Sequence, residues 1–539
     1  MKSWPMLLFG VCCLANGSFL HATDEPGKTP NGIRYHGGDE IILQGFHWNS
    51  VRVQPGQWYT VLKDDAARIA ADGFTSVWMP PPWRDTSHWT NQAAGTSGGG
   101  EGYFWHDFDK SGGYGTDAQL HAAVDALDAA GVKPIYDIVP NHHRQDAPGA
   151  QLTIPKGEGR LRSDCATCDD GDPFMAGDAD LNLANAANLA MFRDELRVLH
   201  DTYGAGGFRF DFVRGYAGKH VGDWMAAADD AGLCVGEYWK GPAEFPQGDS
   251  RRTKSWQELL KAWSDESHCT VFDFALKERM QSGSVADWRH GLNGNPDPRW
   301  REVAVTFVDN HDTGTSPGPN GGQHHWPLPS GLRLKAYAYI LTTPGSPTVY
   351  WPDMYGDATT SLHDYLRDLI RLRRNAGVHA QSAVVFETKY GGLVANVTGE
   401  RQRLVVALDS TLLEPRDLVD EPFVPALEAD GGKVRIWHAG IVDRLPVTFR
   451  CDNGKTMPGQ SVYVVGSSKE LGQWDPAKAV LLKSSTYPAW TGTIDVSPAF
   501  VVEWKCVMRN ESTGAVSAWE PGDNNRTVPA AGAVATGSF

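Results

Sequence analysis

The segment from residue 207 to residue 213 reads Gly-Phe-Arg-Phe-Asp-Phe-Val and has the alternating pattern of a β-strand. Because successive side chains of a strand point to opposite faces, Phe208, Phe210 and Phe212 should share one face. Arg209 and Asp211 should share the other face. We expect the aromatic face to pack under helices and the charged pair to line the mouth of a larger sheet. A buried Arg–Asp pair that only stabilises the fold is the alternative interpretation.

Seven further strand-like runs accompany this segment between residues 41 and 375, and helical patterns lie between them. Helices are predicted at 58–72, 117–130 and 362–376, and in the second of these Asp117 can cap the start and Gly131 the end. Repeated strand–helix units favour a parallel sheet, and eight of them favour a closed (β/α)8 TIM barrel of the α/β class. The eight strand candidates are 41–46, 75–79, 132–137, 207–212, 233–237, 270–274, 303–308 and 346–350.

The interval between the third and fourth strands spans about 70 residues, which is more than a helix and two turns require. We therefore predict an inserted subdomain at 141–200, rich in Asp and Gly, within a barrel formed by 24–140 and 201–377. After the barrel, short strands separated by turns predict a small antiparallel β-domain at 378–438. A brief join at 439–445, not rich in Gly or Ser, precedes a second β-rich unit at 446–539.

The composition is that of a globular protein rich in aromatic residues. The 539 residues include 20 tryptophans, with 41% hydrophobic residues and a net charge of −16 from 49 basic and 65 acidic side chains. A disordered chain has few aromatic residues and a nucleic-acid-binding protein is usually basic, so both classes are disfavoured. Indole rings offer rigid apolar faces on which sugars stack, although tryptophans that merely fill the core are the alternative. The length allows roughly three or four domains, or one barrel with smaller modules.

The first 23 residues have the pattern of an export signal peptide. Lys2 gives a weak basic start, residues 7–14 form an apolar run, and the residues at 18–23 lead to a cleavage point near Ala22 or Thr23. The apolar run is too short for a transmembrane helix, and no second hydrophobic stretch of spanning length follows. We therefore expect a secreted protein that does not bind membranes.

Six cysteines remain after the signal peptide, and an even number in an exported chain favours disulfides. Six cysteines allow 15 pairings, but proximity along the chain favours the pairing of sequence neighbours. A redox or zinc motif at the Cys-x-x-Cys pair is the alternative, although no second pair with ligand spacing follows it. The favoured pairs are Cys165 with Cys168, Cys234 with Cys269, and Cys451 with Cys506.

Acidic residues and histidines stand where several predicted strands end. Asp211 ends the fourth strand, Glu237 ends the fifth, and Asp312 follows the seventh. His311 precedes Asp312, and His142 follows the third strand. Active sites of (β/α)8 barrels form at the carboxyl ends of the strands, so these side chains should converge.

Three acids with one arginine and two histidines, without a Ser-His-Asp or Cys-His set, suit the hydrolysis of a glycosidic bond. Asp211 fits the nucleophile because the adjacent Arg209 favours its ionised form. Glu237 fits the general acid and base because neighbouring carboxylates raise its pKa. Asp312 would hold hydroxyls of the distorted sugar, to which His142 and His311 would donate hydrogen bonds.

Four segments on the third, fourth, fifth and seventh strands resemble the signature segments of the α-amylase family of retaining glycoside hydrolases. They are Asp137-Ile-Val-Pro-Asn-His, the segment at 207–213, Gly-Glu-Tyr at 236–238 and Phe-Val-Asp-Asn-His-Asp at 307–312. The resemblance covers residues 24–437. Within the family it is closest to the bacterial maltotetraose-forming exo-amylases, through the segments at 45–49, 100–107, 169–172, 178–182 and 321–326.

The resemblance implies hydrolysis of α-1,4-glucans with retention of configuration. It assigns Asp211 as nucleophile, Glu237 as acid and base and Asp312 as the third acid. Tyr103 matches the aromatic residue that stacks on the sugar at the cleavage site, and Phe104 follows it in the same motif. Further candidates for contact with the substrate are Lys240, Glu244 and Gln323, with an ordinary surface position as the alternative for each.

The inserted segment carries several acids and no cluster of histidine or thiolate ligands, which favours a hard cation such as calcium. A solvated acidic loop is the alternative. The resemblance implies that the calcium site shared by the family is formed by Asn141, Asp169, Asp172, Asp180 and the carbonyl of Gly215. It also implies a second calcium site, conditional on cleavage after Thr23, whose ligands would be Asp24, Glu25, His36, Asp39 and Glu40.

Exo-action requires a wall that recognises the non-reducing end of the glucan. Asp178 matches the residue with this role in the maltotetraose-forming relatives. The chain departs from their pattern at Ala176, where they have a glycine, and its insert is shorter around Cys165 and Cys168. An endo-acting enzyme with products of other lengths is the alternative at these positions.

The last unit, 446–539, resembles a starch-binding module of the family-20 type and is expected to be a β-sandwich. Trp474, Lys505, Trp519 and Asn525 correspond to one binding site, and Tyr463 corresponds more weakly to a second. An extra residue in the loop after Trp519 leaves Asn524 as an alternative to Asn525. Trp490 and Trp504 are expected to lie in the core.

These observations predict a secreted, calcium-dependent exo-amylase that is a monomer and releases maltotetraose from starch. The rival activities are an endo-α-amylase with the same acids and a cyclodextrin-forming transglycosylase, for whose additional domain the chain lacks room. A non-catalytic glucan-binding protein would keep the aromatic residues and lose the acids, and all three acids are present. Five further tryptophans are expected at or near the cleft: Trp48, Trp83, Trp105, Trp239 and Trp326.

Overall fold

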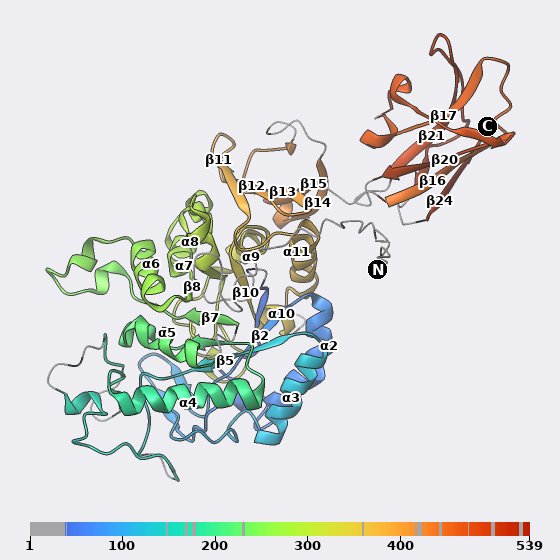
Figure 1. Ribbon diagram of the computed structural model, residues 1–539. Helices are drawn as coiled ribbons and strands as arrows, with labels where there is room; N and C mark the ends of the chain where they lie inside the picture. Colours follow the sequence, from blue (N-terminus) through green and yellow to red (C-terminus); the bar gives the residue numbers. More distant parts are fainter. Residues whose placement is uncertain are drawn as a thin grey trace, which may run out of the picture.

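Eight parallel strands close into a barrel in the order β1-β10-β9-β8-β7-β6-β5-β2 (Figure 1). All eight predicted strands are confirmed, and their residues are buried almost throughout, as expected for strands covered by helices. The barrel strands are β1 (Ile42–Gln44), β2 (Ser76–Met79), β5 (Lys133–Ile138), β6 (Gly207–Phe210), β7 (Leu233–Gly236), β8 (Thr270–Phe272), β9 (Ala304–Phe307) and β10 (Ser346–Tyr350). A two-stranded ribbon, β3 (Trp89–Asn91) and β4 (Thr96–Gly98), follows β2.

This computed structural model describes residues 38, 40–146, 149–165, 168, 171–174, 179–228, 232–357, 361–415, 418, 423–440, 445–472, 474–496, 502–527 and 532–539. The predicted signal peptide lies outside the described residues. So do five of the predicted calcium ligands and the predicted end-recognising acid: Asp24, Glu25, His36, Asp39, Asp169 and Asp178.

Helices surround the barrel strands (Figure 1). The three predicted helices are present, and Gly73 and Gly377, both in left-handed conformations, end α2 and α11. The helices are α1 (Ser50–Val53), α2 (Trp58–Asp72), α3 (Asp117–Ala129), α4 (Ala186–Tyr203), α5 (Gly218–Ala227), α6 (Trp256–Ser267), α7 (Phe274–Ser282), α8 (Pro298–Val303), α9 (Arg333–Thr342), α10 (Trp351–Tyr355) and α11 (His363–Ala376).

The cap of α3 differs from the prediction by one residue. Thr116, in an extended conformation, accepts a hydrogen bond from the backbone N–H of Gln119, and the Gln119 side chain closes a capping box. Asp117 is the first helical residue instead, and its carboxylate accepts a hydrogen bond from the Tyr203 hydroxyl at 2.6 Å. The threonine hydroxyl therefore takes the capping role that we had assigned to the aspartate.

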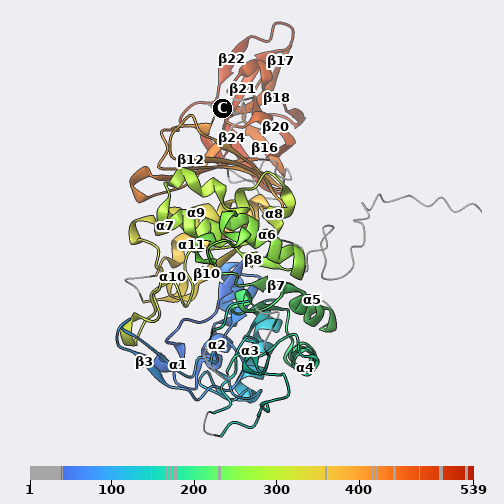
Figure 2. The ribbon, with the colours of Figure 1, turned by 90° about the vertical axis from the view of Figure 1, so that its left-hand side faces the viewer.

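A five-stranded antiparallel sheet follows the barrel. Figures 1 and 2 both show it between helices α9 and α11 and the C-terminal unit. Lys335 of α9 connects the barrel to this sheet, because its Nζ lies 3.0 Å from Asp409 and 3.4 Å from Asp430. The strand order is β11-β12-β13-β15-β14, from β11 (Ala383–Glu387), β12 (Leu393–Thr398), β13 (Gln402–Leu408), β14 (Phe423–Ala429) and β15 (Val434–Gly440).

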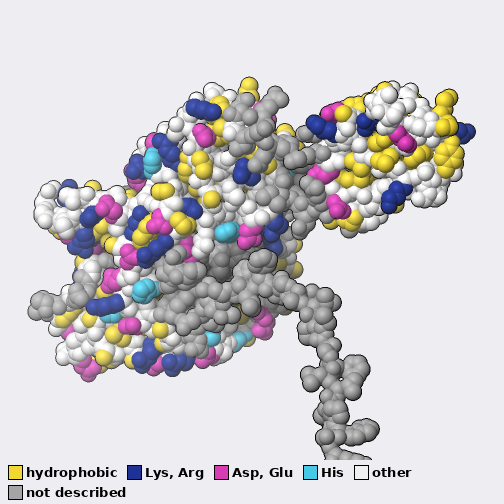
Figure 3. All heavy atoms as spheres, turned by 45° about the horizontal axis from the view of Figure 1, so that its top comes forward, with side chains coloured by type: hydrophobic (Ala, Val, Ile, Leu, Met, Phe, Trp, Pro, Cys, Tyr) yellow, Lys and Arg dark blue, Asp and Glu magenta, His cyan; other side chains and the backbone are white. Residues whose placement is uncertain are grey.

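The C-terminal unit contains two sheets around a core of its own, as a β-sandwich does. Hydrophobic side chains gather on its surface in the view of Figure 3. One sheet is β19-β20-β16-β24 and the other β18-β17-β21-β22 with β23 on β21; the strands are β16 (Leu445–Asp452), β17 (Gln460–Gly466), β18 (Val480–Leu481), β19 (Lys483–Thr486), β20 (Ala489–Val496), β21 (Val502–Asn510), β22 (Val516–Trp519), β23 (Asn525–Thr527) and β24 (Val534–Ser538).

All three predicted disulfides are present: Cys165–Cys168, Cys234–Cys269 and Cys451–Cys506. The last joins the two sheets of the C-terminal unit, since Cys451 lies on β16 and Cys506 on β21. Trp490 and Trp504 are buried in this unit, as predicted. Within the part of the chain that the structure describes, every helix is too short or too polar to cross a membrane.

Candidate active site

Two acids emerge from the barrel where neighbouring strands end. The backbone N–H of Asp211 donates to the carbonyl of Ile138 at 2.8 Å, and that of Glu237 donates to the carbonyl of Phe210 at 3.0 Å. These bonds continue the barrel ladder by one residue past β6 and β7. The position of each carboxylate is therefore fixed by the sheet, and not by a loop.

The strand pattern at β6 holds for four residues and then changes. Phe208 and Phe210 are fully buried, and Phe210 stacks on Trp224 of α5. Phe212, predicted on the same face, instead has a left-handed backbone with φ of 47° and lines the cleft. The chain turns there because the strand has ended, and the Phe212 N–H donates to Oε2 of Glu237 at 3.2 Å.

Arg209 holds three carboxyl groups on one guanidinium. Its Nη1 lies 2.7 Å from Oδ1 of Asp211 and 2.7 Å from Oδ1 of Asp137, and its Nη2 forms an ion pair with Oε1 of Glu237 at 2.8 Å. The arginine side chain is fully buried. It lies behind the acids and does not line the cleft, so it orients Asp211 and Glu237 without reaching the substrate.

Burial raises the pKa of Asp211, Glu237, Asp312 and Asp137, and the positive charge of Arg209 opposes this effect. Arg209 was predicted to keep Asp211 ionised, but burial and the neighbouring carboxyls outweigh this one shared cation and the pKa of Asp211 is raised. Repulsion between neighbouring carboxylates also raises the pKa of these groups. Retention of a proton on Glu237 is what a general acid requires.

Asp312 lies on the loop after β9, where Asn310 shapes the backbone. Oδ1 of Asn310 accepts hydrogen bonds from the N–H groups of Asp312 at 3.0 Å and Thr313 at 2.8 Å. The Asp312 side chain is 21% exposed, more than the 10% of Asp211 or the 7% of Glu237. Asp312 therefore projects furthest into the cleft, as expected for an acid that holds sugar hydroxyls.

His311 is a neutral hydrogen-bond donor in this arrangement. Burial and the nearby Arg209 lower the pKa of His311 well below its usual range. The side-chain amide of Gln44 donates to Nδ1 at 2.9 Å, which leaves the ring hydrogen on Nε2. Nε2 of His311 lies 3.2 Å from Oδ2 of Asp312, and the His311 side chain is 1% exposed.

His142 uses its donor within the protein. Its Nε2 donates to the backbone carbonyl of Tyr103 at 2.7 Å, and burial lowers its pKa to about 4. The remaining ring nitrogen, Nδ1, has no hydrogen-bond partner. His142 therefore presents an acceptor in this structure, whereas the sequence argument had it donating to the sugar.

Near-parallel rings form one wall of the cleft. The ring centroid of Tyr103 lies 5.0 Å from that of His311, with an angle of 7° between the ring planes. It lies 5.9 Å from the centroid of Trp48, with an angle of 14° between the planes. The Tyr103 hydroxyl donates to Oδ2 of Asp137 at 2.7 Å, which fixes the ring. Such a wall suits the apolar face of a sugar ring.

The cleft that these residues line has a volume of about 490 Å³. Nine predicted site residues line it: Tyr103, Phe104, His142, Asp211, Glu237, Glu244, His311, Asp312 and Gln323. Lys240 does not, because its Nζ contacts Asp172 at 2.5 Å. Four lining residues had no predicted role: Phe174, Phe212, Arg214 and His325. Phe174 lies on the insert and is exposed. An aromatic residue in an insert rich in Asp and Gly is the sequence signal that could have identified it.

The predicted cleft tryptophans divide into two groups. Trp48 and Trp239 line the cleft, and Trp326 stacks on Trp239 with ring centroids 6.2 Å apart. Trp83 and Trp105 are buried against each other in the core and do not line it. Their loops are near the strand ends, but their rings point inward to Phe192 of α4.

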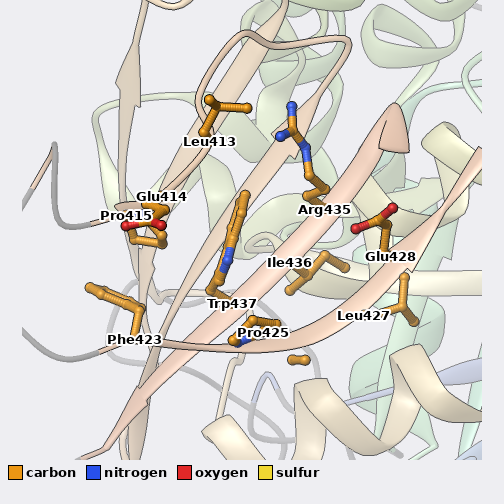
Figure 4. Close-up of a pocket in the computed structure, with 11 residues that line it drawn as sticks. Leu413, Glu414, Pro415, Phe423, Pro425, Leu427, Glu428, Arg435, Ile436 and Trp437 are labelled. Carbon is orange, nitrogen blue, oxygen red and sulfur yellow. The ribbon is translucent and has the colours of Figure 1, made fainter. Parts of the chain in front are cut away.

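A larger hollow of about 760 Å³ lies on the small β-domain, lined by Phe423, Pro425, Arg435, Trp437 and their neighbours (Figure 4). It contains Glu414 and Glu428 but no histidine and no buried carboxylate. Of these two hollows in the described part of the chain, the smaller cleft is the one that combines buried acids with an aromatic wall. The chemistry therefore belongs to the cleft at the barrel mouth.

Three of the predicted calcium ligands, Asn141, Asp180 and Gly215, lie close together. The backbone N–H of Leu181 donates to the carbonyl of Asn141 at 2.9 Å, which brings Asp180 alongside. A Cβ at Gly215 would lie 2.1 Å from Oδ1 of Asn141, so only glycine lets this amide reach the Gly215 backbone. These hard oxygen donors fit calcium.

Asp172 is engaged otherwise. Its carboxylate contacts Lys240 at 2.5 Å and Arg214 at 2.7 Å, so in this structure two cations satisfy it. Among the described residues, no three histidine, cysteine, aspartate or glutamate side chains cluster as metal ligands. Glu40, predicted for the second site, is buried. The other four predicted ligands of that site lie outside the described residues.

The predicted starch-binding residues occupy the surface of the C-terminal unit. Trp519 is 42% exposed at the end of β22, and Trp474 is half-buried in the loop after β17. Lys505 donates to the carbonyls of Glu520 at 3.0 Å and Gly522 at 2.7 Å, and so supports the loop that carries Trp519. Tyr463 has Arg509 over its ring at 4.7 Å.

The two candidate asparagines of the loop after Trp519 differ in exposure. The side-chain amide of Asn525 donates to Oε2 of Glu520 at 2.8 Å and is half-buried, whereas Asn524 is exposed. Asn525 is therefore occupied in holding the loop. Asn524 is the more accessible of the two for a ligand.

Comparison with known proteins places this geometry in a family. The family described as "Starch binding domain" matches residues 444–538, and "Glucan 1,4-alpha-maltotetraohydrolase, domain C" matches residues 360–420. The chain is 56% identical to the glucan 1,4-alpha-maltotetraohydrolase of Roseateles saccharophilus, over 97% of each chain. It is 55% identical to that of Stutzerimonas stutzeri, over 95% of this chain and 96% of the relative.

Solved structures agree on the fold. An α-amylase from Geobacillus thermoleovorans, complexed with acarbose, superposes with a TM-score of 0.53 at 17% identity and covers 74% of this chain and 98% of its own. The γ-cyclodextrin glucanotransferase of Bacillus clarkii gives 0.51 at 16% identity, over 94% of this chain and 98% of its own. Paired acids at the strand ends and near full-length similarity lead to one conclusion: the chain belongs to the glucan 1,4-alpha-maltotetraohydrolase family of glycoside hydrolases.

Proposed function

We propose that the enzyme hydrolyses α-1,4-glucosidic bonds of starch from non-reducing ends and releases maltotetraose. The observation that carries the proposal is the bridge of Arg209 between Asp211 and Glu237 in a cleft with an aromatic wall. One guanidinium keeps the two carboxyls close together, which suits a retaining mechanism. The relatives that share the whole chain are maltotetraohydrolases.

In the first step, an oxygen of Asp211 attacks the anomeric carbon while Glu237 gives its proton to the departing glycosidic oxygen. A glycosyl ester of Asp211 forms and the leaving chain departs as an alcohol. In the second step, ionised Glu237 removes a proton from water, and the oxygen of that water displaces Asp211. The product keeps the α configuration, and Glu237 regains its proton.

Asp312 holds hydroxyls of the distorted sugar in this scheme, and the neutral His311 donates from Nε2 beside it. Tyr103 supports the sugar face, and Phe104 and Gln323 line the approach. Arg209 acts behind the acids as a positioning residue. Glu244 lines the cleft and forms an ion pair with Arg214 at 2.9 Å, which supports a role at an outer subsite.

The C-terminal unit would bind starch through Trp474 and Trp519, with Lys505 and Asn524 or Asn525 beside them. Matching of residues 444–538 to the starch-binding family supports this role. Binding of the polymer raises the local concentration of chain ends at the cleft. We further propose that the mature enzyme is secreted after removal of residues 1–23 and acts as a monomer, with partners limited to starch and maltooligosaccharides.

Calcium would be held by Asn141, Asp180 and the Gly215 carbonyl, with Asp169 and Asp172 completing the set. It would clamp the insert to the barrel, since these ligands come from 141, 169–180 and 215. The second site, with Asp24, Glu25, His36, Asp39 and Glu40, stays a prediction. So does the end-recognising role of Asp178.

Product analysis on an oligosaccharide blocked at its non-reducing end tests exo-action. The unblocked substrate should release maltotetraose as the first product, with the α configuration at its reducing end in NMR spectra. The blocked substrate should resist hydrolysis. Rapid cleavage of the blocked substrate into mixed products would show endo-action instead.

A further inference from the structure

A buried lysine lies beneath the cleft, on helix α7, and has no part in the proposed reaction. The side chain of Lys277 is 0% exposed. Its Nζ donates to Oδ1 of Asp309 at 2.7 Å and to the carbonyl of Val308 at 2.8 Å. The ammonium therefore holds both the end of β9 and the carboxylate that follows it.

The Asp309 carboxylate also accepts hydrogen bonds from two loops. Its Oδ1 accepts a hydrogen bond from the Thr313 hydroxyl at 3.0 Å, and its Oδ2 accepts one from the backbone N–H of Leu328 at 3.1 Å. The Asp309 side chain is 5% exposed. One carboxylate, held by one lysine, thus ties together the segments 309–313 and 323–328.

Both segments contribute side chains to the cleft. The first carries His311 and Asp312, and the second carries Gln323 and His325. The two segments also bond directly, since the His325 N–H donates to the Asp312 carbonyl at 2.8 Å.

Helix α7 has a second contact with the same region. Nε2 of Gln281, one turn after Lys277, donates to the carbonyl of Trp326 at 2.6 Å. Lys277 Nζ itself lies 5.8 Å from the centroid of the Trp326 ring. One face of α7 therefore anchors the segment 323–328 at two points.

Stability alone does not account for this ion pair. Taking an ammonium and a carboxylate out of water costs several kcal/mol per ion, and apolar replacements of similar volume are often as stable. An apolar pair makes no directional hydrogen bonds, so it could not fix the orientation of the loop. The bonds of Lys277 and Asp309 fix the loop that carries Asp312 relative to the barrel.

We propose that Lys277 is a positioning residue for catalysis, which acts through Asp309 to hold Asp312 in its working position. The inference rests on the proposed hydrolytic function. A displacement of the third acid would weaken its contact with the distorted sugar. The displacement would therefore lower kcat by more than it changes KM.

The test compares Lys277→Met with Lys110→Met. Lys110 is a matched control because its Nζ contacts Glu195 at 2.7 Å with side-chain exposures of 6% and 7%, and neither residue lines the cleft. Both variants should lose thermal stability. On a soluble maltooligosaccharide only Lys277→Met should lose kcat, by about 10²-fold, the effect of a misplacement of roughly 1 Å. An equal kcat in the two variants would overturn the proposal.

A double variant separates a loss of positioning from a loss of stability. In Lys277→Met with Asp309→Asn both charges are gone, so stability should rise above that of Lys277→Met alone while kcat stays low. Recovery of kcat together with stability would show that the pair has only a structural role. Lys277→Arg, which keeps a buried donor, should retain more kcat than Lys277→Met.

The wild-type enzyme separates the two hypotheses. If it releases no oligosaccharide from the same substrate, the proposed function fails. If it is active and Lys277→Met is equally active, only the positioning role fails.

Discussion

The guanidinium of Arg209 lies 2.7 Å from the carboxylate of Asp211, yet the arginine is fully buried and does not line the cleft. The cation therefore acts on the substrate only through the acids that it holds. Its planar fork reaches Asp137, Asp211 and Glu237 at once, which a compact ammonium cannot do.

Arg209→Lys should keep the charge and lose this geometry. We expect kcat to fall by about 10²-fold, because the acids that Arg209 holds would be misplaced, with a smaller change in KM. Steady-state kinetics on a soluble maltooligosaccharide measure this. Arg214→Lys, at the rim, is the control and should affect KM more than kcat; the opposite pattern would contradict a role for Arg209 behind the acids.

Glu237→Gln removes the proton donor and leaves its shape. Turnover should fall by about 10²-fold or more, because general acid catalysis contributes at least that much. Substrate binding, measured by calorimetry with a maltooligosaccharide longer than maltotetraose, should be retained. Near-normal turnover would show that another residue donates the proton.

The activity should depend on pH through Glu237. The enzyme needs Glu237 protonated, so kcat/KM should decline as the pH rises through its pKa, which burial raises. The negative charge of Asp137 raises this pKa further. Asp137→Asn should therefore move the alkaline limb of the pH profile to lower pH. A shift to higher pH would contradict the assignment of this limb to Glu237.

Calcium should stabilise the folded protein through the insert. With calcium at 100 times its Kd, the wild type should gain about 2.7 kcal/mol of unfolding free energy relative to the chelated protein. Asp180→Asn should lose this gain in a thermal melt. Asp146→Asn, at an exposed acid of the same insert, should keep it. Equal responses of the two variants would remove Asp180 from the site.

Trp519→Ala should reduce adsorption to starch granules and leave kcat on short soluble substrates unchanged. The ring is 42% exposed on a unit with its own core, so its loss affects only the binding surface. Met457→Ala, at a side chain of the same unit that is 72% exposed, is the control. Similar adsorption of both variants in a sedimentation assay would contradict a glucan-binding role for Trp519.

The sequence predicted the barrel and its acids because both depend on local patterns. Alternation at β6 placed Arg209 and Asp211 together, and the ends of the strands placed Glu237 and Asp312 beside them. The pattern could not predict that Phe212 would leave its face, because the strand ends two residues earlier and the backbone turns to φ of 47°.

Side-chain partners from distant elements were also beyond reach. Nothing local to Lys240 indicated that Asp172 would engage it, and nothing local to His142 indicated that the Tyr103 carbonyl would take its donor. Trp83 and Trp105 follow strand ends as cleft residues do, but helix α4 covers them. These outcomes depend on tertiary packing between segments far apart in the chain.

Strand β1 pairs with β2 on one side and with β10 on the other, so the first and last strands of the barrel are neighbours. Their residues, Ile42–Gln44 and Ser346–Tyr350, are separated by roughly 300 positions, a contact of very high sequence separation. A ribosome must finish β10 before this seam can form. Barrel closure is therefore a late event in the life of the nascent chain, and a chain truncated before β10 is left with two open sheet edges.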